Sequence, residues 1–282
     1  MIASEEVAAA GQLACLLEVS APKPGNVSPG RHFHDTRYED FLASAVAIGP
    51  ALAAAGSRPL GATIFAAADA TARWTRSNTN LGIILLLAPL ARAAHRQRGA
   101  LRDELREVLA ETTVADAAEA YAAIRRARPG GLGAASSEDV ASAPTVTLRD
   151  AMALAAGRDG VAREYATDFA TTFEIGAPAL RAARGSGLDW SAATVETYLR
   201  LLAAGPDTHI ARKLGHAAAE AVARRAREIE ATGGVRTPEG RLALEAFDAE
   251  LRSPTNTHNP GTTADLTCAA LFVVILEGKR NR

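Results

Sequence analysis

Cysteine, methionine and tryptophan each occur only twice in the 282 residues, and aromatic residues make up 5% of the chain. The two cysteines, Cys15 and Cys268, both lie inside apolar helical runs. We therefore interpret them as small core residues rather than as a disulfide or a catalytic thiol. So little cysteine fits a protein of the reducing cytosol.

An excess of charge of one sign is also missing. Lys and Arg total 31 against 32 Asp and Glu, which leaves a formal net charge of −1. A protein whose main partner is duplex nucleic acid normally carries a global basic excess. The balance excludes that class, and we do not expect nucleic acid as the main partner.

Long hydrophobic runs are absent as well. The longest, Leu81 to Ala91, contains Pro89 and is about half of the ~20 residues that a membrane-spanning helix needs. The first residues, Met1 to Glu6, lack the basic start and apolar stretch of a signal peptide. A hydrophobic fraction of 48% excludes wholesale disorder. The sequence predicts a soluble, cytoplasmic, globular protein without a membrane partner.

Apolar residues recur mostly at steps of three and four, the period of an amphipathic helix, and strand patterns are almost absent. We predict an all-α fold, a single large multi-helix globular domain over residues 1–282 with about ten or eleven helices. Helix starts are marked by Thr36 with Glu39, Thr147 with Asp150, Thr237 before Pro238 and Asn259 before Pro260. The expected helices are 3–19, 37–55, 60–76, 80–97, 101–127, 148–156, 159–183, 191–204, 207–231, 238–252 and 260–277.

Two connections, 20–35 and 128–144, exceed the ~2–8 residues typical between packed helices. Residues 128–144 are small and flexible in composition. This segment is either a mobile lid or a disordered surface excursion, and the composition fits both.

The first long loop concentrates polar side chains within a path fixed by three prolines and two glycines. Lys23, Asn26, Ser28 and Arg31 in this loop could grip an anionic ligand, although a surface turn with solvated charges explains them equally simply. His32 and His34 could form a metal pair, but no third histidine or cysteine lies nearby at ligand spacing, so zinc is not expected. Asp35 either supports the cap at Thr36 or holds a metal ion.

Two further clusters stand at helix starts. Asn78, Thr79 and Asn80 precede the most apolar helix, where they either cap it or bind an anion together with its amides. Asp207 occupies the expected N-cap of the helix at 207–231. His209, Arg212, Lys213 and His216 share one face of that helix, which is either an anion site or a solvated charged face.

The last cluster opens the apolar helix at 260–277 and contains Asn259, Thr262 and Asp265. A carboxylate in a helix destined for the core needs a cation, a metal ion or hydrogen bonds, so Asp265 is a functional candidate. Converging helix starts would present amides to an anion, and Asp35, Asp207 and Asp265 could hold Mg²⁺ through oxygen. These features favour a nucleotide or sugar phosphate site.

The combination of Glu18 with PKPGNVSP, NTNLG near residue 80, an Asp207 helix and NPGTTADL near residue 260 resembles the triphosphoribosyl-dephospho-CoA synthase family. The resemblance runs in the same order from Glu18 to Leu276. It implies a helical enzyme that joins the triphosphoribosyl unit of ATP to dephospho-CoA and expels adenine, for the prosthetic group of decarboxylase acyl carrier proteins. It also implies that the site is lined by Lys23, Asn26, Asn78, Asn80, Asp207, Asn259 and Asp265.

The chain departs from that pattern at Leu81, where enzymes of the decarboxylase systems carry a basic residue. The RDGVAREY stretch at 158–165 resembles a divergent branch from organisms that use tetrahydromethanopterin. In that branch a pterin cofactor precursor is the acceptor and phosphoribosyl pyrophosphate is an alternative donor to ATP. A nucleotide or coenzyme binding protein without turnover is the competing class, and a purely structural scaffold leaves the polar helix starts unexplained.

Ribosyl transfer passes through an oxocarbenium-like state, so the enzyme must hold phosphates and move a proton from an acceptor hydroxyl. We expect Lys23, Arg212 and Lys213 to hold the donor phosphates with Mg²⁺, aided by amides near Asn78 and Asn259. Asp265 and Asp207 are the candidates for general base or metal ligand, and the sequence does not separate the two roles.

Overall fold

The computed structural model describes residues 2–96, 98–131, 133, 135, 137–253 and 255–280. Within these residues the chain forms fifteen α-helices, a π-helical turn, a 3-10 turn and no β-strand. In chain order these are α1 Ser4–Ser20, α2 Tyr38–Ala47, α3 Gly49–Ala53, α4 Leu60–Ala72, α5 Leu81–Arg96, α6 Leu101–Ala110, α7 Val114–Ala127, α8 Leu148–Ala155, α9 Gly160–Ala166, η1 Thr171–Gly176, α10 Ala177–Gly185, α11 Trp190–Ala204, α12 Thr208–Leu214, α13 His216–Ala231, η2 Gly234–Arg236, α14 Pro238–Leu251 and α15 Gly261–Arg280.

The all-α prediction is confirmed, but ten or eleven helices is too low a number for the described residues. Four of the expected helices are interrupted, at 48, 111–113, 167–176 and 215. Gly215 at φ +87° ends α12, and Asp168 and Phe169 at φ +51° and +58° end α9. Thr113 starts α7 with a capping box to Asp116. Apolar residues keep the helical period across such breaks, so the pattern alone does not show them.

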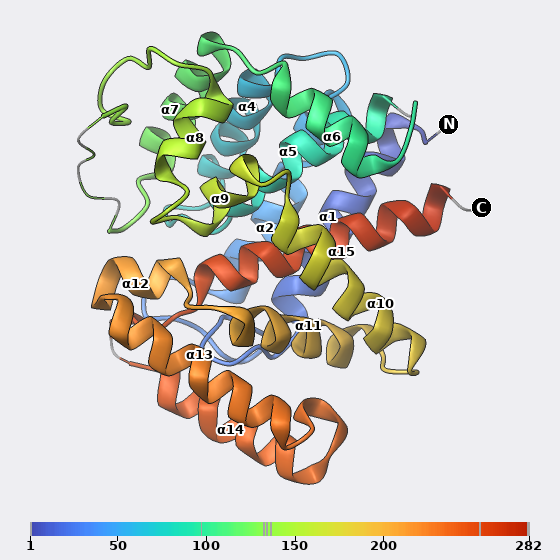
Figure 1. Ribbon diagram of the computed structural model, residues 1–282, viewed down its shortest axis with the longest axis vertical. Helices are drawn as coiled ribbons and strands as arrows, with labels where there is room; N and C mark the ends of the chain where they lie inside the picture. The colour runs from blue at the N-terminus through green and yellow to red at the C-terminus, as the bar shows by residue number, and fades with distance from the viewer. Residues whose placement is uncertain are drawn as a thin grey trace.

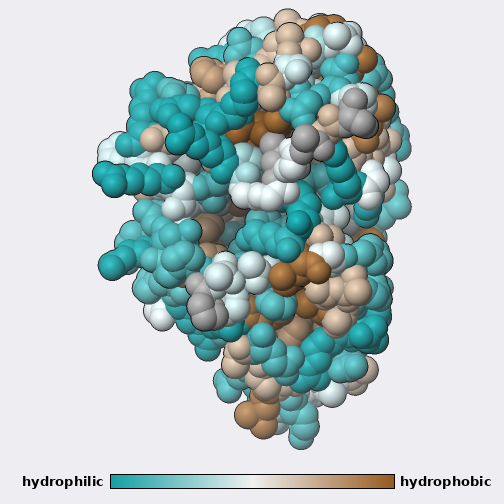
Figure 2. All heavy atoms as spheres, turned by 90° about the vertical axis from the view of Figure 1, so that its left-hand side faces the viewer, coloured by the Kyte–Doolittle hydropathy of each residue, from teal (hydrophilic) through white to brown (hydrophobic). Residues whose placement is uncertain are grey.

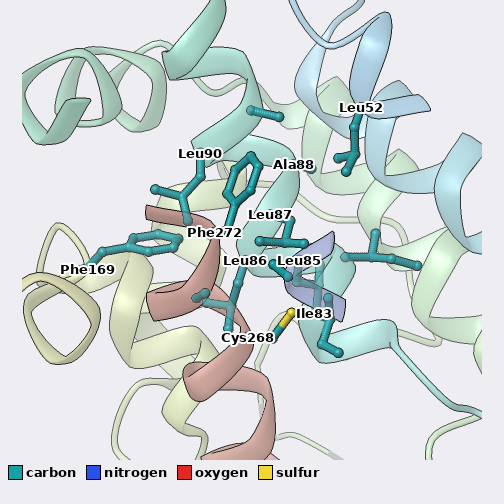
Figure 3. Packing of buried hydrophobic residues seen from close by; sticks show 14 of the residues in the cluster. Leu52, Ile83, Leu85, Leu86, Leu87, Ala88, Leu90, Phe169, Cys268 and Phe272 are labelled. Atoms are coloured by element: carbon teal, nitrogen blue, oxygen red, sulfur yellow. The ribbon is translucent and has the colours of Figure 1, made fainter. Parts of the chain in front are cut away.

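Helix α15 is the centre of the molecule (Figure 1). It packs against α1, α5, α10, α11 and η1. In the view of Figure 1, α4 to α9 lie above it and α11 to α14 below it. Figure 3 shows Phe272 and Cys268 of α15 among leucines of α5, in the larger of two hydrophobic clusters. The smaller cluster joins α11, α13 and α14.

By length and composition, Gly261–Lys279 in α15 is the one helix of the described residues that could cross a membrane. The sequence analysis considered only the run at Leu81 and missed it. More than half of this segment, 56%, is buried inside the protein, and Cys268 to Val273 are fully covered. The same properties suit a core helix, which is the position that α15 takes here. The cytoplasmic location stays a prediction.

Pro89 lies inside α5 and has no amide hydrogen to give to the carbonyl of Leu85 four residues earlier. The buried hydroxyl of Tyr165 donates to that carbonyl at 2.6 Å instead. Tyr165 belongs to α9, so the defect in α5 becomes a link between the two helices. This link holds the last turn of α9 against α5, and the beginning of α9 contributes to the cavity described below.

Because α4 and α7 pack closely, we predict that a methyl group added at Gly61 of α4 will destabilise the protein. A Cβ atom on Gly61 would lie 2.5 Å from the backbone Cα and O of Asp116 in α7. Gly61→Ala should therefore lower the free energy of unfolding by about 1–3 kcal/mol. Gly278 in α15 has open space around the same position. As the matched control, Gly278→Ala should add about 0.5–1 kcal/mol, and urea melts of both variants check this. Equal stability of the two variants would contradict the packing of α4 on α7.

Candidate active site

A cavity of about 1080 Å³ opens where the helix starts meet. Figure 2 views the left-hand side of Figure 1, where the surface is mostly hydrophilic and hollowed at mid-height. The cavity is bordered by the end of α1, the first long loop, the start of α5, helices α7 to α9, α12 and the start of α15. Ten of the predicted site residues line it: Asn26, Asp35, Asn78, Thr79, Asn80, Arg212, Lys213, Asn259, Thr262 and Asp265. Lys23, Ser28, Arg31 and Asp207 do not.

Lys23 is buried and holds Glu18 rather than facing the cavity. Its ammonium lies 2.9 Å from Glu18 Oε1, and the two side chains are 0% and 5% exposed. It also donates to the carbonyl oxygens of Glu18 and Ala21. Glu18 itself lines the cavity. The structure thus places Lys23 behind the wall, where it compensates the charge of a carboxylate that borders the cavity.

Ser28 and Arg31 shape the loop. Their backbones form an isolated bridge, and the Arg31 guanidinium pairs with Asp248 of α14 at 2.9 Å. Asp248 also accepts from the amide of Gly25 at 2.8 Å, and Arg252 donates to the carbonyl of Asn26 at 2.8 Å. Residues far apart in sequence therefore fasten the loop to α14, and the charge of Arg31 is used within the protein.

Asp207 joins two helix starts. Its Oδ1 accepts from the amides of His209 and Ile210 at 2.8 and 3.1 Å, and its Oδ2 accepts from the amide and the hydroxyl of Thr263 at 2.7 Å each. Both oxygens are thus occupied, and Asp207 is only 3% exposed. This geometry suits a positioning residue and leaves no oxygen directed at a substrate or a metal ion.

The polar residues before α5 have different structural roles. Asn78 accepts from the amide of Leu81 at 3.1 Å and so caps α5, as the simpler interpretation had it. Asn80 donates to Thr71 of α4 at 3.2 Å, and the Thr79 hydroxyl lies 2.5 Å from that of Ser44 in α2. These contacts fix the start of α5 against α2 and α4 on one side of the cavity.

The starts of α9, α12 and α15 converge, but side chains already occupy their amides. The Thr208 hydroxyl accepts from the amide of Gly160 at 2.9 Å and lies 3.0 Å from the Thr262 hydroxyl. Asp159 accepts from two amides of α9, and Asp207 accepts from those of α12 and α15 described above. These amides are therefore not free for an anion. An anion in this cavity would therefore have to be held mainly by cationic side chains.

The cavity wall carries such cations, most of which the sequence analysis missed. Besides Arg212 and Lys213, the lining includes Arg76, Arg126, Arg128 and Arg158. Arg126 and Arg128 lie at the end of α7, where only the adjoining long connection, 128–144, marks them in the sequence. The same cavity is also lined by carboxylates, and this combination of charges suits an anionic ligand.

Asp265 borders the cavity and makes no hydrogen bond to the described residues. Its carboxylate lies against the start of α5, so that a Cβ on Gly82 would be 2.1 Å from Asp265 Oδ2. Burial raises the pKa of Asp265 well above its usual range, and the nearby carboxylates of Glu18, Asp207 and Asp159 raise it further, against the opposing charge of Arg212. The shift favours the protonated carboxyl of Asp265 over the carboxylate, and in that form the group can donate a proton.

A second network lies beside it. Arg212 donates to Asp159 Oδ2 and, through Nη2, to His209 Nδ1 at 3.2 Å. Burial lowers the pKa of His209 to about 3, and the charges of Lys213 and Arg212 add to the effect. His209 is therefore neutral. With Glu18, Asp159 and His209 are cavity residues that the sequence analysis quoted but did not assign to the site.

No group of three or more His, Cys, Asp or Glu side chains among the described residues is placed to hold a metal ion. Asp35 is 58% exposed and lies 3.8 Å from His34, while His32 accepts from the amide of Tyr38 at 3.2 Å. These residues do not fit a metal site built by protein alone. Mg²⁺ stays a prediction and would enter as part of the nucleotide substrate, since it usually binds through phosphates and water.

The part of 128–144 that the structure describes forms a wall of the cavity. Glu138 and Val140 line it, and the Tyr121 hydroxyl of α7 donates to the carbonyl of Glu138 at 2.7 Å. Residues 132, 134 and 136 of the predicted lid lie outside the described residues. Whether the segment closes over a ligand stays a prediction.

A comparison of the sequence with models of protein families identifies the family of this chain. Residues 4–282 match the family model CitG, described as ATP:dephospho-CoA triphosphoribosyl transferase. The chain belongs to this family. The crystal structure of a candidate triphosphoribosyl-dephospho-CoA synthase from Archaeoglobus fulgidus is similar, with a TM-score of 0.65 and 28% identity over 84% of this chain and 99% of that chain. The resemblance predicted from the motifs is confirmed.

Membership of the triphosphoribosyl transferase family makes the chain a transferase with ATP as the implied donor. Leu81, the departure noted in the sequence, is 6% exposed and lines the cavity beside the cap of α5. No cation stands at that position. The arginines at the end of α7 and beside α9 supply positive charge to the same cavity from other elements.

The position of Lys23 predicts how its loss will act. Lys23→Met would leave Glu18 buried without its cation, which should lower the free energy of unfolding by about 3–5 kcal/mol. The matched control is Lys213→Met, because Lys213 lines the cavity without an ion pair in the described residues. That variant should keep its stability and bind ATP more weakly. Urea melts and ATP titrations check both, and a stable Lys23→Met with weakened ATP binding would restore Lys23 as a phosphate ligand.

Proposed function

We propose that this family member transfers the triphosphoribosyl unit of ATP to a hydroxyl of dephospho-CoA and releases adenine in the cavity. The observation that carries the proposal is Asp265, a carboxyl with a raised pKa that faces the cavity without a hydrogen-bond partner among the described residues. A purine is a poor leaving group as an anion, so a proton donor at this point serves the reaction.

The donor phosphates lie toward the cationic side chains of the wall. Arg76, Arg128 and Arg158 are exposed in the lining and, with Lys213, surround the polar floor. Charge-assisted hydrogen bonds from guanidinium groups suit phosphate oxygens. Asn259, whose Oδ1 is buried without a partner in the described residues, belongs to the floor on which the ribose would lie.

Glu18 and Asp265 each carry out one of the two proton transfers. Lys23 keeps the charge of Glu18 compensated, so Glu18 is the carboxylate that accepts the proton of the acceptor hydroxyl. Asp265 donates its proton to a ring nitrogen of adenine as the bond from C1′ of ribose to nitrogen breaks and the bond to the acceptor oxygen forms. The proton on Glu18 then passes through solvent to Asp265, so that both groups return to their starting states. Two carboxyl groups in different environments are the usual means of assigning such roles.

A second candidate follows from Leu81 and the apolar flank of the cavity. Leu148, Met152 and Leu154 of α8 line that flank together with Tyr121. A flat pterin precursor would fit an apolar wall, and Leu81 replaces a cation that a full triphosphate would use. In this alternative the chain transfers a ribosyl phosphate to a pterin cofactor precursor in tetrahydromethanopterin biosynthesis.

Mass spectrometry of two reactions separates the candidates. Purified protein with Mg²⁺ receives ATP and dephospho-CoA in one tube, and phosphoribosyl pyrophosphate with an aminophenyl-ribitol pterin precursor in the other. We expect free adenine and a triphosphoribosyl adduct of dephospho-CoA in the first. Pyrophosphate and a ribosyl phosphate adduct only in the second would replace the proposal with the pterin alternative. No product in either tube would contradict both.

The role of Asp265 predicts opposite effects of Asp265→Asn on activity and stability. Loss of the proton donor should reduce kcat about 10²-fold or more. The raised pKa means that Asp265 contributes stability at low pH, which is lost as the pH rises through its folded-state pKa. Asparagine does not ionise, so the variant does not lose this stability as the pH rises. Its melting temperature should therefore fall less than that of the parent between pH 5 and pH 9.

Asp35→Asn is the control for this prediction, because Asp35 borders the same cavity but is exposed. Its melting temperature should follow that of the parent at every pH. An Asp265→Asn protein that folds normally and turns over at the parent rate would remove Asp265 from the mechanism.

A further inference from the structure

His209 lies in the first turn of α12, and its ring stands over the first residue of α15. A Cβ on Gly261 would be 3.3 Å from the Cγ atom of the ring, a contact tight enough that a side chain there would displace the ring by a few tenths of an ångström. Gly261 and Asp265 are four residues apart and share one face of α15. The ring of His209 thus lies one helical turn before the position of Asp265 on α15, and both residues border the cavity.

Arg212 determines which nitrogen of His209 carries the proton. Its Nη2 lies 3.2 Å from His209 Nδ1, and a guanidinium group can only donate. His209 Nδ1 must therefore accept, and a neutral ring then carries its proton on Nε2. His209 Nε2 makes no hydrogen bond to the described residues. The donor of the ring is thus free for a ligand.

Arg212 is itself held by Asp159. Oδ1 of Asp159 accepts from the amides of Val161 and Ala162 at 2.9 and 3.1 Å, which fixes the carboxylate at the start of α9. Its Oδ2 binds Arg212 Nη1. The start of α9 therefore orients Arg212, and Arg212 orients the ring of His209. Asp159 and Arg212 are positioning residues for the imidazole.

We infer that neutral His209 donates a hydrogen bond from Nε2–H to a ring nitrogen of the purine. Asp265 protonates this same purine. The inference rests on the proposed release of adenine. A purine edge offers several nitrogen acceptors, and both donors, on the adjoining starts of α12 and α15, border the cavity. Binding the departing base through two donors would stabilise its lone pairs as the bond to ribose breaks.

The surroundings exclude the more common role of histidine as a base. Arg212 and Lys213 on α12 carry positive charge near the ring, and Asp159 and Asp265 border the same cavity from the starts of α9 and α15. Burial and the two cations lower the pKa of the ring to about 3, so it is neutral but a weak proton acceptor. With these neighbours, the role that remains for the His209 ring is that of a fixed hydrogen-bond donor.

Equilibrium binding of free adenine tests the inference without turnover. The parent protein should bind adenine more tightly than 3-deazaadenine or 7-deazaadenine, whichever lacks the nitrogen that His209 contacts. His209→Ala should weaken adenine binding about tenfold and lose that one preference, because one hydrogen bond is removed. His209→Gln places an amide donor near the same point and should keep both the affinity and the preference.

The outcomes separate this inference from the proposed function. Adenine binding that is equal in the parent and in His209→Ala would overturn the role of His209 and leave the release of adenine standing. A parent that binds neither adenine nor its analogues would overturn both. Loss of binding in His209→Ala that His209→Gln does not rescue would indicate a structural role and overturn the inference.

The tautomer gives a second readout that is independent of any ligand. With ¹⁵N-labelled histidine, His209→Gln assigns the signals of His209 among the six histidines of the chain. We expect an unprotonated Nδ1 and a protonated Nε2 in the parent, and loss of this fixed state in Arg212→Met. A proton on Nδ1 in the parent would overturn the inference.

Discussion

The hydrogen bonds of Asp207 are the constraint on which the site depends. One carboxylate accepts from two amides of α12 and from the amide and hydroxyl of Thr263 in α15. This fixes two helix starts at one distance and in one orientation. His209 extends from the first start and Asp265 from the second, so both reach the cavity with little freedom to move. Such positioning by groups behind the wall is what a reaction with precise geometry requires.

The electrostatics of the cavity follow from which charges are paired. Glu18 has Lys23 and Asp159 has Arg212, while Asp265 has no hydrogen-bond partner in the described part of the chain. An unpaired carboxyl among paired carboxylates responds to burial and repulsion by holding its proton. The exposed side chains of Arg76, Arg128 and Arg158 line the same cavity. One cavity thus combines cationic side chains with a carboxyl whose pKa is raised.

The sequence predicted the helical class, the motifs and most residues of the site, because helix period and cap signals are local. It did not predict the roles of Lys23, Arg31 and Asp207. Two of their partners, Asp248 and Thr263, lie 217 and 56 residues away, and no spacing rule connects them. Polar residues at a helix start also look alike whether they face a ligand or another helix. The arginines at the end of α7 lacked any motif, so only the folded chain identifies them as lining residues.

The pair formed by Glu18 and Lys23 links the stability of the fold to the chemistry of the floor. A buried carboxylate without its cation would tend to take up a proton, and its repulsion on Asp265 would then disappear. That repulsion is one of the causes that raise the pKa of Asp265. Lys23 therefore acts on Asp265 through Glu18, although it never borders the cavity. In the proposed mechanism, the motif that contains Lys23 would serve the reaction by preserving a negative charge beside Asp265, although Lys23 does not line the cavity.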